Sequence, residues 1–349
     1  MSIVYLKMIS PIAAILLRIS LFLVLSRTLA ARPFTDVSGK VIEAEFVSLE
    51  NGTVTISKDG HPFKLPLVRF IKADQEFIAA QASVGTPALR ATGKLEIAGK
   101  VITRGGAINI VEAPLTEDTL KKTRKHKEVT SIKLGIVLPT NFDPAVPAKF
   151  LWVSSPINSE ADRLAGNIPS IGTYAATAVS QGWAVIAVDC NLGNPRRDDN
   201  AATDVDLPIH HQAVAMLSAA WPGFSKSTFA CAGYSGGSKA SFYRVGQLAT
   251  ANLQVSGLFL GGCNEDKTED AKKETKVRSG DLRQIKVFVS NGKTDDIATV
   301  AAGKAVGESA DKEFGAVRIE TFEGGHTISQ EQLKSALAWF IEPAKPGGR

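Results

Sequence analysis

Residues 231–242, CAGYSGGSKASF, form the stretch that decides the fold of this 349-residue chain. The apolar run STFACA leads into Gly233, and residues 238–250 have helical spacing. Residues 233–237 fit the pattern Gly-x-Ser-x-Gly, in which small neighbours let a strained serine protrude between a strand and a helix. The stretch therefore predicts a strand, a sharp turn and a helix, with Ser235 at the turn.

Apolar runs alternate with helical stretches on both sides of this segment. From Lys149 onward the runs are FLWVSS, WAVIAVDC, STFACAGYS, VSGLFLGG, IKVFVSNG and VRIETFEGG. Continuous apolar strands separated by helices of about ten residues or more indicate a parallel sheet that is buried on both faces. Two further β-prone segments precede them, near residues 107–111 and 131–138. We therefore expect residues 100–345 to form a doubly wound, mostly parallel α/β domain.

Three residues that follow strands suggest a nucleophilic site. Ser235 comes first, Asp295 follows the strand IKVFVSNG, and His326 lies in a glycine-flanked loop after the next strand. This is the chain order in which a serine nucleophile, its acid and its general base occur on such a sheet. The sequence predicts Ser235 as the nucleophile, His326 as the base and Asp295 as the acid, with the adjacent Asp296 as the alternative acid.

Other acidic and histidine residues receive different interpretations. Asp266 and Glu265 follow the preceding strand, VSGLFLGG, and offer a second alternative for the acid. Asp189 comes before the nucleophile strand in the chain, so we expect it to fix a loop. His210 and His211 lie in a helix-like stretch and are expected to pack or cap.

Stabilising a tetrahedral oxyanion requires two backbone donors. The N–H of Gly236, directly after the serine, is the first expected donor because it also opens the following helix. The second should come from the loop SSPINSE after the strand FLWVSS. Pro156 has no N–H, so the choice lies between Ser155 and Ile157, and Ile157 is the preferred donor.

GYSGG, GKTDDIA and EGGHTIS, with the strands between them, resemble the α/β-hydrolase family over about residues 131–343. The nearest similarity is to esterases and dienelactone-hydrolase-like members. The resemblance implies hydrolysis of carboxylic esters through an acyl-enzyme, without a cofactor or metal. The sequence departs from many lipases at SSPINSE, where those proteins have His-Gly. The natural substrate is not implied.

Residues 32–80 carry a different pattern. Short β-prone runs are separated by Ser38-Gly39, Asn51-Gly52 and Asp59-Gly60, which are turn-forming pairs. The order RPFTD, SGK, EAEFV, LPL and ADQEF is similar to the Sla-type homology domain. That resemblance implies a small Src-homology-3-like barrel with a binding or spacer role, whose ligand would be a peptide or a surface.

The first thirty residues read as a secretory leader. Lys7 and Arg18 precede a short apolar run, and Thr28 and Ala30 fit a cleavage site after Ala30, with cleavage after Ala31 or an uncleaved anchor as the alternatives. Loss of this segment, which also contains Arg27, lowers the net charge from +5 to +2, so a nucleic-acid partner is not expected. The apolar run is too short for a membrane span. We expect an exported protein, periplasmic or extracellular, with residues 81–99 as a linker.

Two alternative functions use the same sequence features. The chain could be a non-catalytic exported binding protein that uses the hydrolase fold and the barrel as a platform, or a serine peptidase with the same triad. The three cysteines, Cys190, Cys231 and Cys263, lie in or after apolar runs and are interpreted as buried small side chains. No metal-ligand spacing occurs in the sequence.

Overall fold

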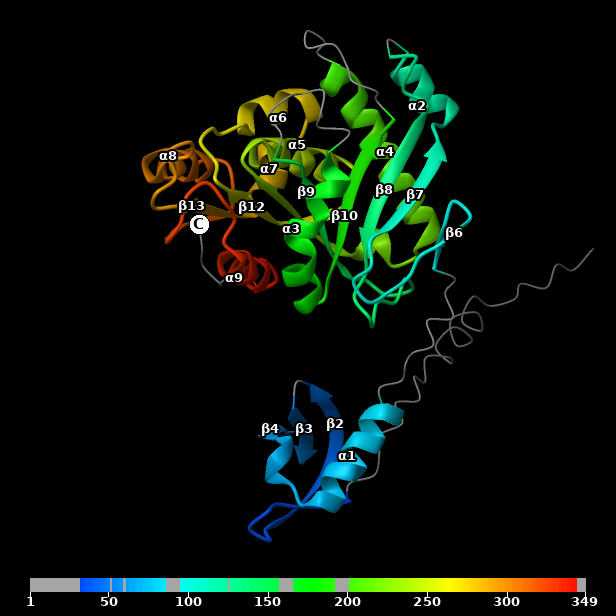
Figure 1. Ribbon diagram of the computed structural model, residues 1–349, viewed down its shortest axis with the longest axis vertical. Helices are drawn as coiled ribbons and strands as arrows, with labels where there is room; N and C mark the ends of the chain where they lie inside the picture. The colour runs from blue at the N-terminus through cyan, green and yellow to red at the C-terminus, as the bar shows by residue number, and fades with distance from the viewer. Residues whose placement is uncertain are drawn as a thin grey trace, which may run out of the picture. The chain divides into compact units, whose positions relative to one another are not determined.

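The computed structural model describes residues 32–50, 52–58, 61–85, 95–124, 126–156, 166–191 and 201–343 (Figure 1). The chain divides into two compact units, Met1–Leu89 and Arg90–Arg349. The predicted leader, residues 1–30, lies outside the described residues, as do residues 86–94 of the predicted linker. Cleavage and export stay predictions.

The smaller unit is an antiparallel sheet followed by a helix. Strands β1 (Arg32–Thr35), β2 (Val41–Glu50), β3 (Thr53–Lys58) and β4 (His61–Pro66) pair in chain order, and α1 (Lys72–Gly85) follows. Its core is a small apolar cluster of Phe34, Ala44, Phe46, Val54, Ile56, Phe70 and Ile78. The alternating runs of the sequence thus form strands with one buried face.

Contacts with Asp74 fasten α1 to the first strand of this unit. The Arg32 guanidinium donates to Asp74 Oδ1 at 2.7 Å, and the Thr35 N–H donates to Oδ2 at 2.6 Å. An isolated bridge joins Asp36 to Phe70. The structure therefore has a four-stranded antiparallel sheet, while closure into a barrel and a peptide-binding role remain predictions.

The larger unit is built on an eight-stranded sheet in the order β14-β13-β12-β11-β9-β10-β8-β7. The six strands from β14 to β10 run parallel to one another. β8 runs antiparallel to both of its neighbours, β10 and β7. Their bounds are β7 Asn109–Pro114, β8 Ser131–Val137, β9 Lys149–Ser154, β10 Trp183–Cys190, β11 Thr228–Tyr234, β12 Gln254–Gly261, β13 Lys286–Gly292 and β14 Ala316–Phe322. This sheet confirms the predicted mostly parallel α/β class.

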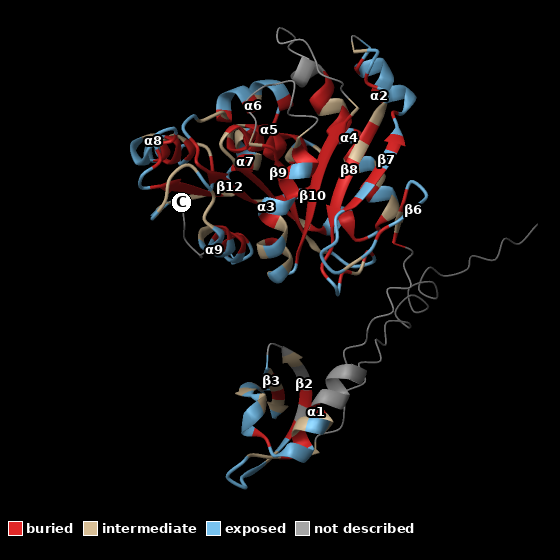
Figure 2. Cartoon of the chain, in the orientation of Figure 1, coloured by how far each residue is buried: buried red, intermediate tan, exposed pale blue. Residues whose placement is uncertain are grey.

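Helices cover both faces of this sheet, and the central strands between them are buried, as Figure 2 shows. Their bounds are α2 Glu117–Lys122, α3 Asn167–Ser180, α4 Ala201–Ala220, α5 Gly236–Thr250, α6 Thr268–Thr275, α7 Ser279–Leu282, α8 Val300–Ala310 and α9 Gln330–Phe340. A short hairpin of β5 (Glu96–Ile97) and β6 (Lys100–Val101) precedes β7. Among the residues described, no helix combines the length and apolar character that a membrane crossing requires.

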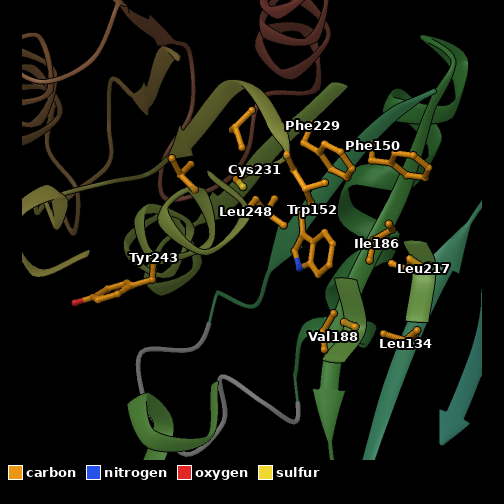
Figure 3. Packing of buried hydrophobic residues seen from close by; sticks show 14 of the residues in the cluster. Leu134, Phe150, Trp152, Ile186, Val188, Leu217, Phe229, Cys231, Tyr243 and Leu248 are labelled. Carbon is orange, nitrogen blue, oxygen red and sulfur yellow. The ribbon is translucent and has the colours of Figure 1, made fainter. Parts of the chain in front are cut away.

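Alternation along the strands explains why the central runs are apolar throughout. Phe150 and Trp152 of β9 belong to the core under α4 and α5, seen in Figure 3, whereas Leu151 and Val153 belong to the core under α3 and α9. Successive side chains of a strand point to opposite faces, so a strand covered on both faces needs apolar residues at every position. The two cores hold β9 and β11 firmly at the centre of the sheet.

The strand order has a topological switch point between β9 and β11. After β9 the chain moves to β10 on one side, and after β11 it moves to β12 on the other. Loops that leave two neighbouring parallel strands in opposite directions open a crevice at the carboxyl ends of those strands, where ligands of α/β proteins bind. The segment after β9 begins at Ser155, and the turn after β11 holds Ser235.

Candidate active site

Ser235 occupies a strained turn between β11 and α5. Its backbone has φ 55° and ψ −124°, a conformation that residues with a side chain rarely adopt. Such a residue costs on the order of 1–3 kcal/mol and persists only where the surroundings enforce it. Its N–H donates to the Gly261 carbonyl at 2.9 Å, which fixes the turn to the neighbouring strand β12. The predicted sharp turn is therefore present at Ser235.

The glycines on both sides are required by space. A Cβ atom on Gly233 would lie 1.9 Å from the Gly237 carbonyl oxygen. A Cβ atom on Gly237 would lie 2.5 Å from the Ser155 carbonyl oxygen. Both contacts involve backbone, which cannot rotate away as a side chain can. The Gly-x-Ser-x-Gly spacing thus reflects the close packing of β11, α5 and the segment after β9.

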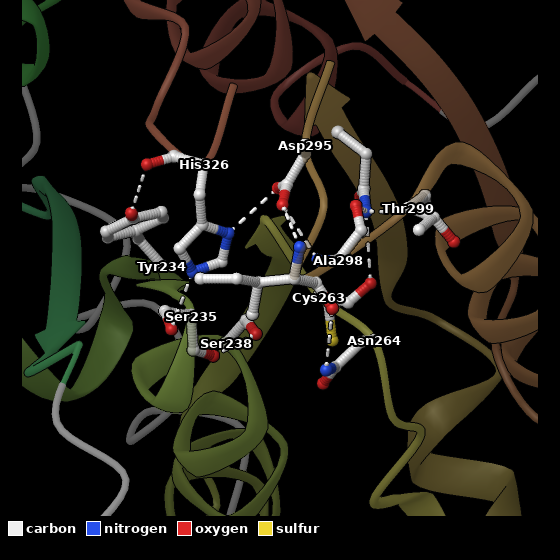
Figure 4. A network of polar contacts seen from close by, with 11 residues as sticks. Tyr234, Ser235, Ser238, Cys263, Asn264, Asp295, Ala298, Thr299 and His326 are labelled. Carbon is white, nitrogen blue, oxygen red and sulfur yellow. Dashed lines mark hydrogen bonds and ion pairs between the residues drawn. The ribbon is translucent and has the colours of Figure 1, made fainter. Parts of the chain in front are cut away.

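Asp295, His326 and Ser235 form one chain of hydrogen bonds, shown in Figure 4. His326 Nδ1 lies 2.8 Å from Asp295 Oδ2, and His326 Nε2 lies 2.9 Å from Ser235 Oγ. The two imidazole nitrogens therefore face an acid on one side and a hydroxyl on the other. Ser235 and Asp295, which are 60 positions apart, both reach His326 because β11 and β13 end at this edge of the sheet.

Backbone donors keep Asp295 charged. Its Oδ1 accepts the N–H groups of Ile297 at 2.9 Å and Ala298 at 2.8 Å. Burial would raise the pKa of this carboxyl, but the Ala298 N–H, His326 and the Ile297 N–H together hold the pKa below its usual value. An acid that stays ionised can fix the imidazole tautomer with Nδ1 protonated and Nε2 free to accept.

The alternative acids have other places. Asp296 is exposed, and His326 Nδ1 contacts Asp295 instead. Asp266 accepts from the N–H and hydroxyl of Thr268 and from the Ser309 hydroxyl. Glu265 forms ion pairs with Lys239 and Lys267. The structure thus brings Asp295, and neither Asp266 nor Glu265, to the histidine.

The two predicted oxyanion donors that the structure describes, Gly236 and Ser155, already donate hydrogen bonds to other groups. The Gly236 N–H donates to the Pro156 carbonyl at 3.1 Å, and the Ser155 N–H donates to Asn167 Oδ1 at 2.8 Å. Ile157 lies outside the described residues. An incoming oxyanion could use the Gly236 N–H only after displacing the Pro156 carbonyl, because one N–H serves one acceptor well.

Sequence reasoning missed the group that holds the Ser155 backbone. Asn167, at the start of α3, donates its amide to the Val188 carbonyl at 2.8 Å while its oxygen accepts from Ser155. Asp189 accepts the N–H groups of Asn167 and Ile168 at 2.9 and 3.0 Å. The expectation that Asp189 fixes a loop was close, since it fixes the first turn of α3. The signal available in the sequence was an acidic residue, Asp189, at the end of an apolar strand.

A second polar cluster lies in the core between α4 and α5. The Arg244 guanidinium binds both carboxylate oxygens of Asp206, and Gln247 donates to the same carboxylate at 2.9 Å. His210 Nδ1 lies 3.0 Å from the Asp206 carbonyl, and the imidazole centre lies 5.7 Å from that of Trp152. The packing predicted for His210 is present, while the Asp206–Arg244 pair was not predicted.

The three cysteines are all buried, as predicted. Burial raises the pKa of the Cys231 and Cys263 thiols, which keeps both protonated and unreactive at neutral pH. In the described part of the chain, no three His, Cys, Asp or Glu side chains are grouped so that they could hold a metal ion.

Comparisons with known proteins find similar solved structures at low sequence identity. No protein-family model and no curated protein matches the sequence. Similar solved structures include a lidless α/β serine hydrolase of Xanthomonas campestris, with 16% identity and a TM-score of 0.44 over 70% of this chain and 100% of that one. A cold-adapted esterase from an Arctic intertidal metagenomic library has 10% identity and a TM-score of 0.42 over 70% and 97% of the two chains. An S-formylglutathione hydrolase of Agrobacterium tumefaciens has 14% identity and a TM-score of 0.42 over 70% and 98%. Likeness at this level decides nothing about the reaction of this chain.

Proposed function

We propose that this chain is a serine hydrolase that cleaves carboxylic esters through an acyl-enzyme. The observation that carries the proposal is the hydrogen-bond chain from Asp295 through His326 to Ser235 Oγ. Its two distances lie within the reach of about 2.6–3.2 Å that proton transfer requires. The strained turn at Ser235 adds to it, because strain of this kind is found where a nucleophile must protrude from a sheet.

The reaction follows from the roles of these atoms. His326 Nε2 takes the proton of Ser235 Oγ as the oxygen attacks the ester carbonyl carbon. The resulting imidazolium is stabilised by Asp295 and gives its proton to the leaving alcohol, which leaves the acyl group on Ser235. Water, deprotonated by the same nitrogen, then attacks the acyl carbon and releases the acid. No cofactor enters these steps.

The charge on the tetrahedral oxyanion needs hydrogen-bond donors beside Ser235. The Gly236 N–H is the nearest candidate by position, since it follows the nucleophile and opens α5. Substrate binding has to move the Pro156 carbonyl away from this N–H before it can serve the oxyanion. The acyl-transfer rate is therefore expected to depend on how readily the backbone at Ser155 and Pro156 shifts.

A fluorophosphonate probe and a short-chain aryl ester test the proposal on the purified chain. Ser235→Ala should abolish labelling and lower ester turnover by about 10⁶-fold, because the nucleophile of a triad is lost. Ser180→Ala, at an exposed position near the end of α3, is the matched control and should keep both activities. A wild-type chain that neither labels nor turns over esters would favour the binding-protein alternative, and turnover of peptides in preference to esters would favour the peptidase.

A further inference from the structure

Tyr234, the residue before the nucleophile, contacts the loop that carries His326. Its hydroxyl donates to the main-chain carbonyl of His326 at 2.5 Å. The centres of the phenol and imidazole rings lie 4.9 Å apart at an angle of 44° (Figure 4). One side chain thus holds both the backbone and the ring of the same histidine.

The imidazole is enclosed on a further side by Gly262. A Cβ atom there would lie 3.1 Å from His326 Cε1 and 3.2 Å from Tyr234 Cε2, and the glycine has φ +51°. The ring therefore lies close to glycine backbone as well as to the phenol. Gly262 in turn donates its N–H to the Ser290 carbonyl at 2.8 Å, so it is fixed to β13. Little room is left for the imidazole to turn.

The rest of the histidine loop is held from a different element. The Thr294 N–H donates to the Gly324 carbonyl and the Lys293 N–H donates to the Phe322 carbonyl, both at 2.9 Å. These bonds fasten the loop to the segment that carries Asp295. The bond from Tyr234 is of another kind, because it connects the histidine backbone to the strand that carries the nucleophile.

The phenol is suited to remain a donor. Burial, and then the negative charge of Asp295, raise the pKa of the Tyr234 hydroxyl, so it keeps its proton over the range in which a histidine base works. A carbonyl oxygen can only accept, so a protonated phenol is the partner that this carbonyl needs.

We propose that Tyr234 is a positioning residue that fixes the distance between His326 Nε2 and Ser235 Oγ by tying the histidine backbone to the nucleophile strand. The inference rests on the proposed function. Proton transfer depends steeply on this distance, and a displacement of about 1 Å can cost about 100-fold in rate. Removing the hydroxyl should loosen the histidine without removing any reacting atom.

Tyr234→Phe tests the proposal because it deletes only the hydroxyl and keeps the ring contact. We expect kcat for an aryl ester and the rate of fluorophosphonate labelling to fall roughly tenfold, with KM and the thermal unfolding midpoint nearly unchanged. Labelling reports on attack alone: the Ser235 oxygen bonds to phosphorus, fluoride leaves, and His326 takes the serine proton. Tyr234→Leu, which also removes the ring, should lower both rates further. Tyr243→Phe on α5 is the control for loss of a tyrosine hydroxyl and should keep wild-type rates.

The outcomes separate the two proposals. An active wild type beside a Tyr234→Phe variant with unchanged kcat and labelling rate would overturn the positioning role and leave the hydrolase proposal intact. A raised KM with unchanged kcat, or a fall in rate that matches a fall in the unfolding midpoint, would likewise show that Tyr234 serves substrate binding or folding instead. A wild type that does not label would overturn both proposals together.

Discussion

Asp295–His326 and Asp206–His210 are both aspartate–histidine pairs, yet their surroundings give them opposite properties. The His326 side chain is 15% exposed and faces Ser235, while the His210 side chain is 2% exposed and lies beside Trp152. In the second pair the aspartate is already bound by Arg244 on both oxygens.

The charges of the buried pair follow from that third partner. Burial would raise the pKa of Asp206, but Arg244 and then His210 lower it to about 2. Burial and Arg244 lower the pKa of His210 to about 3, although Asp206 opposes this shift. His210 is therefore neutral at neutral pH. It cannot act as a catalytic base, because it is inaccessible and has no nucleophile beside it. An acid beside a histidine becomes reactive only where the histidine also meets a nucleophile at an accessible edge.

The largest effect that would sharpen the contrast is expected at the Asp295–His326 pair. Asp295→Asn should lower ester turnover by about 10⁴-fold, because an amide favours the wrong imidazole tautomer. Its side chain keeps an oxygen for the Ile297 and Ala298 N–H groups, so folding should be little changed. Steady-state kinetics check this, with the exposed neighbour as control in Asp296→Asn. Equal losses in the two variants would contradict the assignment of Asp295.

The next effect concerns stability and belongs to the buried pair. Arg244→Met leaves the Asp206 carboxylate buried without its cation and should lower the free energy of unfolding by about 3–5 kcal/mol. All four tryptophans, Trp152, Trp183, Trp221 and Trp339, lie in the larger unit, so tryptophan fluorescence during denaturation follows that unit.

Arg278→Met is the matched control for this change. Arg278 pairs with Asp281 at the surface, where its side chain is 83% exposed, and loss of such a pair costs about 0–1 kcal/mol. Similar losses in the two arginine variants would mean that the Asp206–Arg244 pair is not sheltered from water, and the contrast between the two sites would weaken.

The smallest expected effect is a change in the pH dependence of folding stability. An unfolded histidine takes up a proton near pH 6.5, whereas folded His210 does so only near pH 3. Between these values the unfolded state binds more protons, so stability falls as pH drops, by up to about 1.4 kcal/mol per pH unit. His210→Gln removes this contribution, and its stability should fall less steeply than that of the wild type as pH drops from 6.5.

Denaturation at pH 7, 6, 5 and 4.5 measures that slope. This range stays above about pH 3.9, at which an unfolded aspartate carboxyl is half protonated. Asp206, with its lowered folded pKa, stabilises the fold above this value and loses that contribution only at more acidic pH. Identical slopes in variant and wild type would show that His210 is solvated or charged in the folded chain.

Several parts of the fold could be predicted because they depend on neighbours in the chain. The helix predicted from residue 238 to 250 is α5, Gly236–Thr250. The apolar runs became strands because apolar residues predominate on both faces of the central ones, β9 to β12. The small unit was predicted as hairpins, and its strands pair in chain order, although a closed barrel stays a prediction.

Details of the site depended on contacts that no local pattern encodes. The Gly236 N–H was expected to be available, yet the Pro156 carbonyl accepts it. The bond from Tyr234 to the His326 backbone joins residues 92 positions apart, and a tyrosine within Gly-x-Ser-x-Gly gives no sign of it. The Asp206–Arg244 pair could not be predicted, because the sequence does not show which helix faces meet.

The sequence by itself determined the order of strands and helices, the strained serine between two glycines, and the succession of serine, acid and histidine. These follow from hydrophobic periodicity and from the backbone freedom of glycine, both of which act over a few residues. Only the tertiary structure decided which acid meets His326, what occupies the Gly236 N–H, and which aspartate–histidine pair is sealed in the core. Those outcomes depend on the packing of elements distant in the chain, where a few ångströms separate a hydrogen bond from no contact.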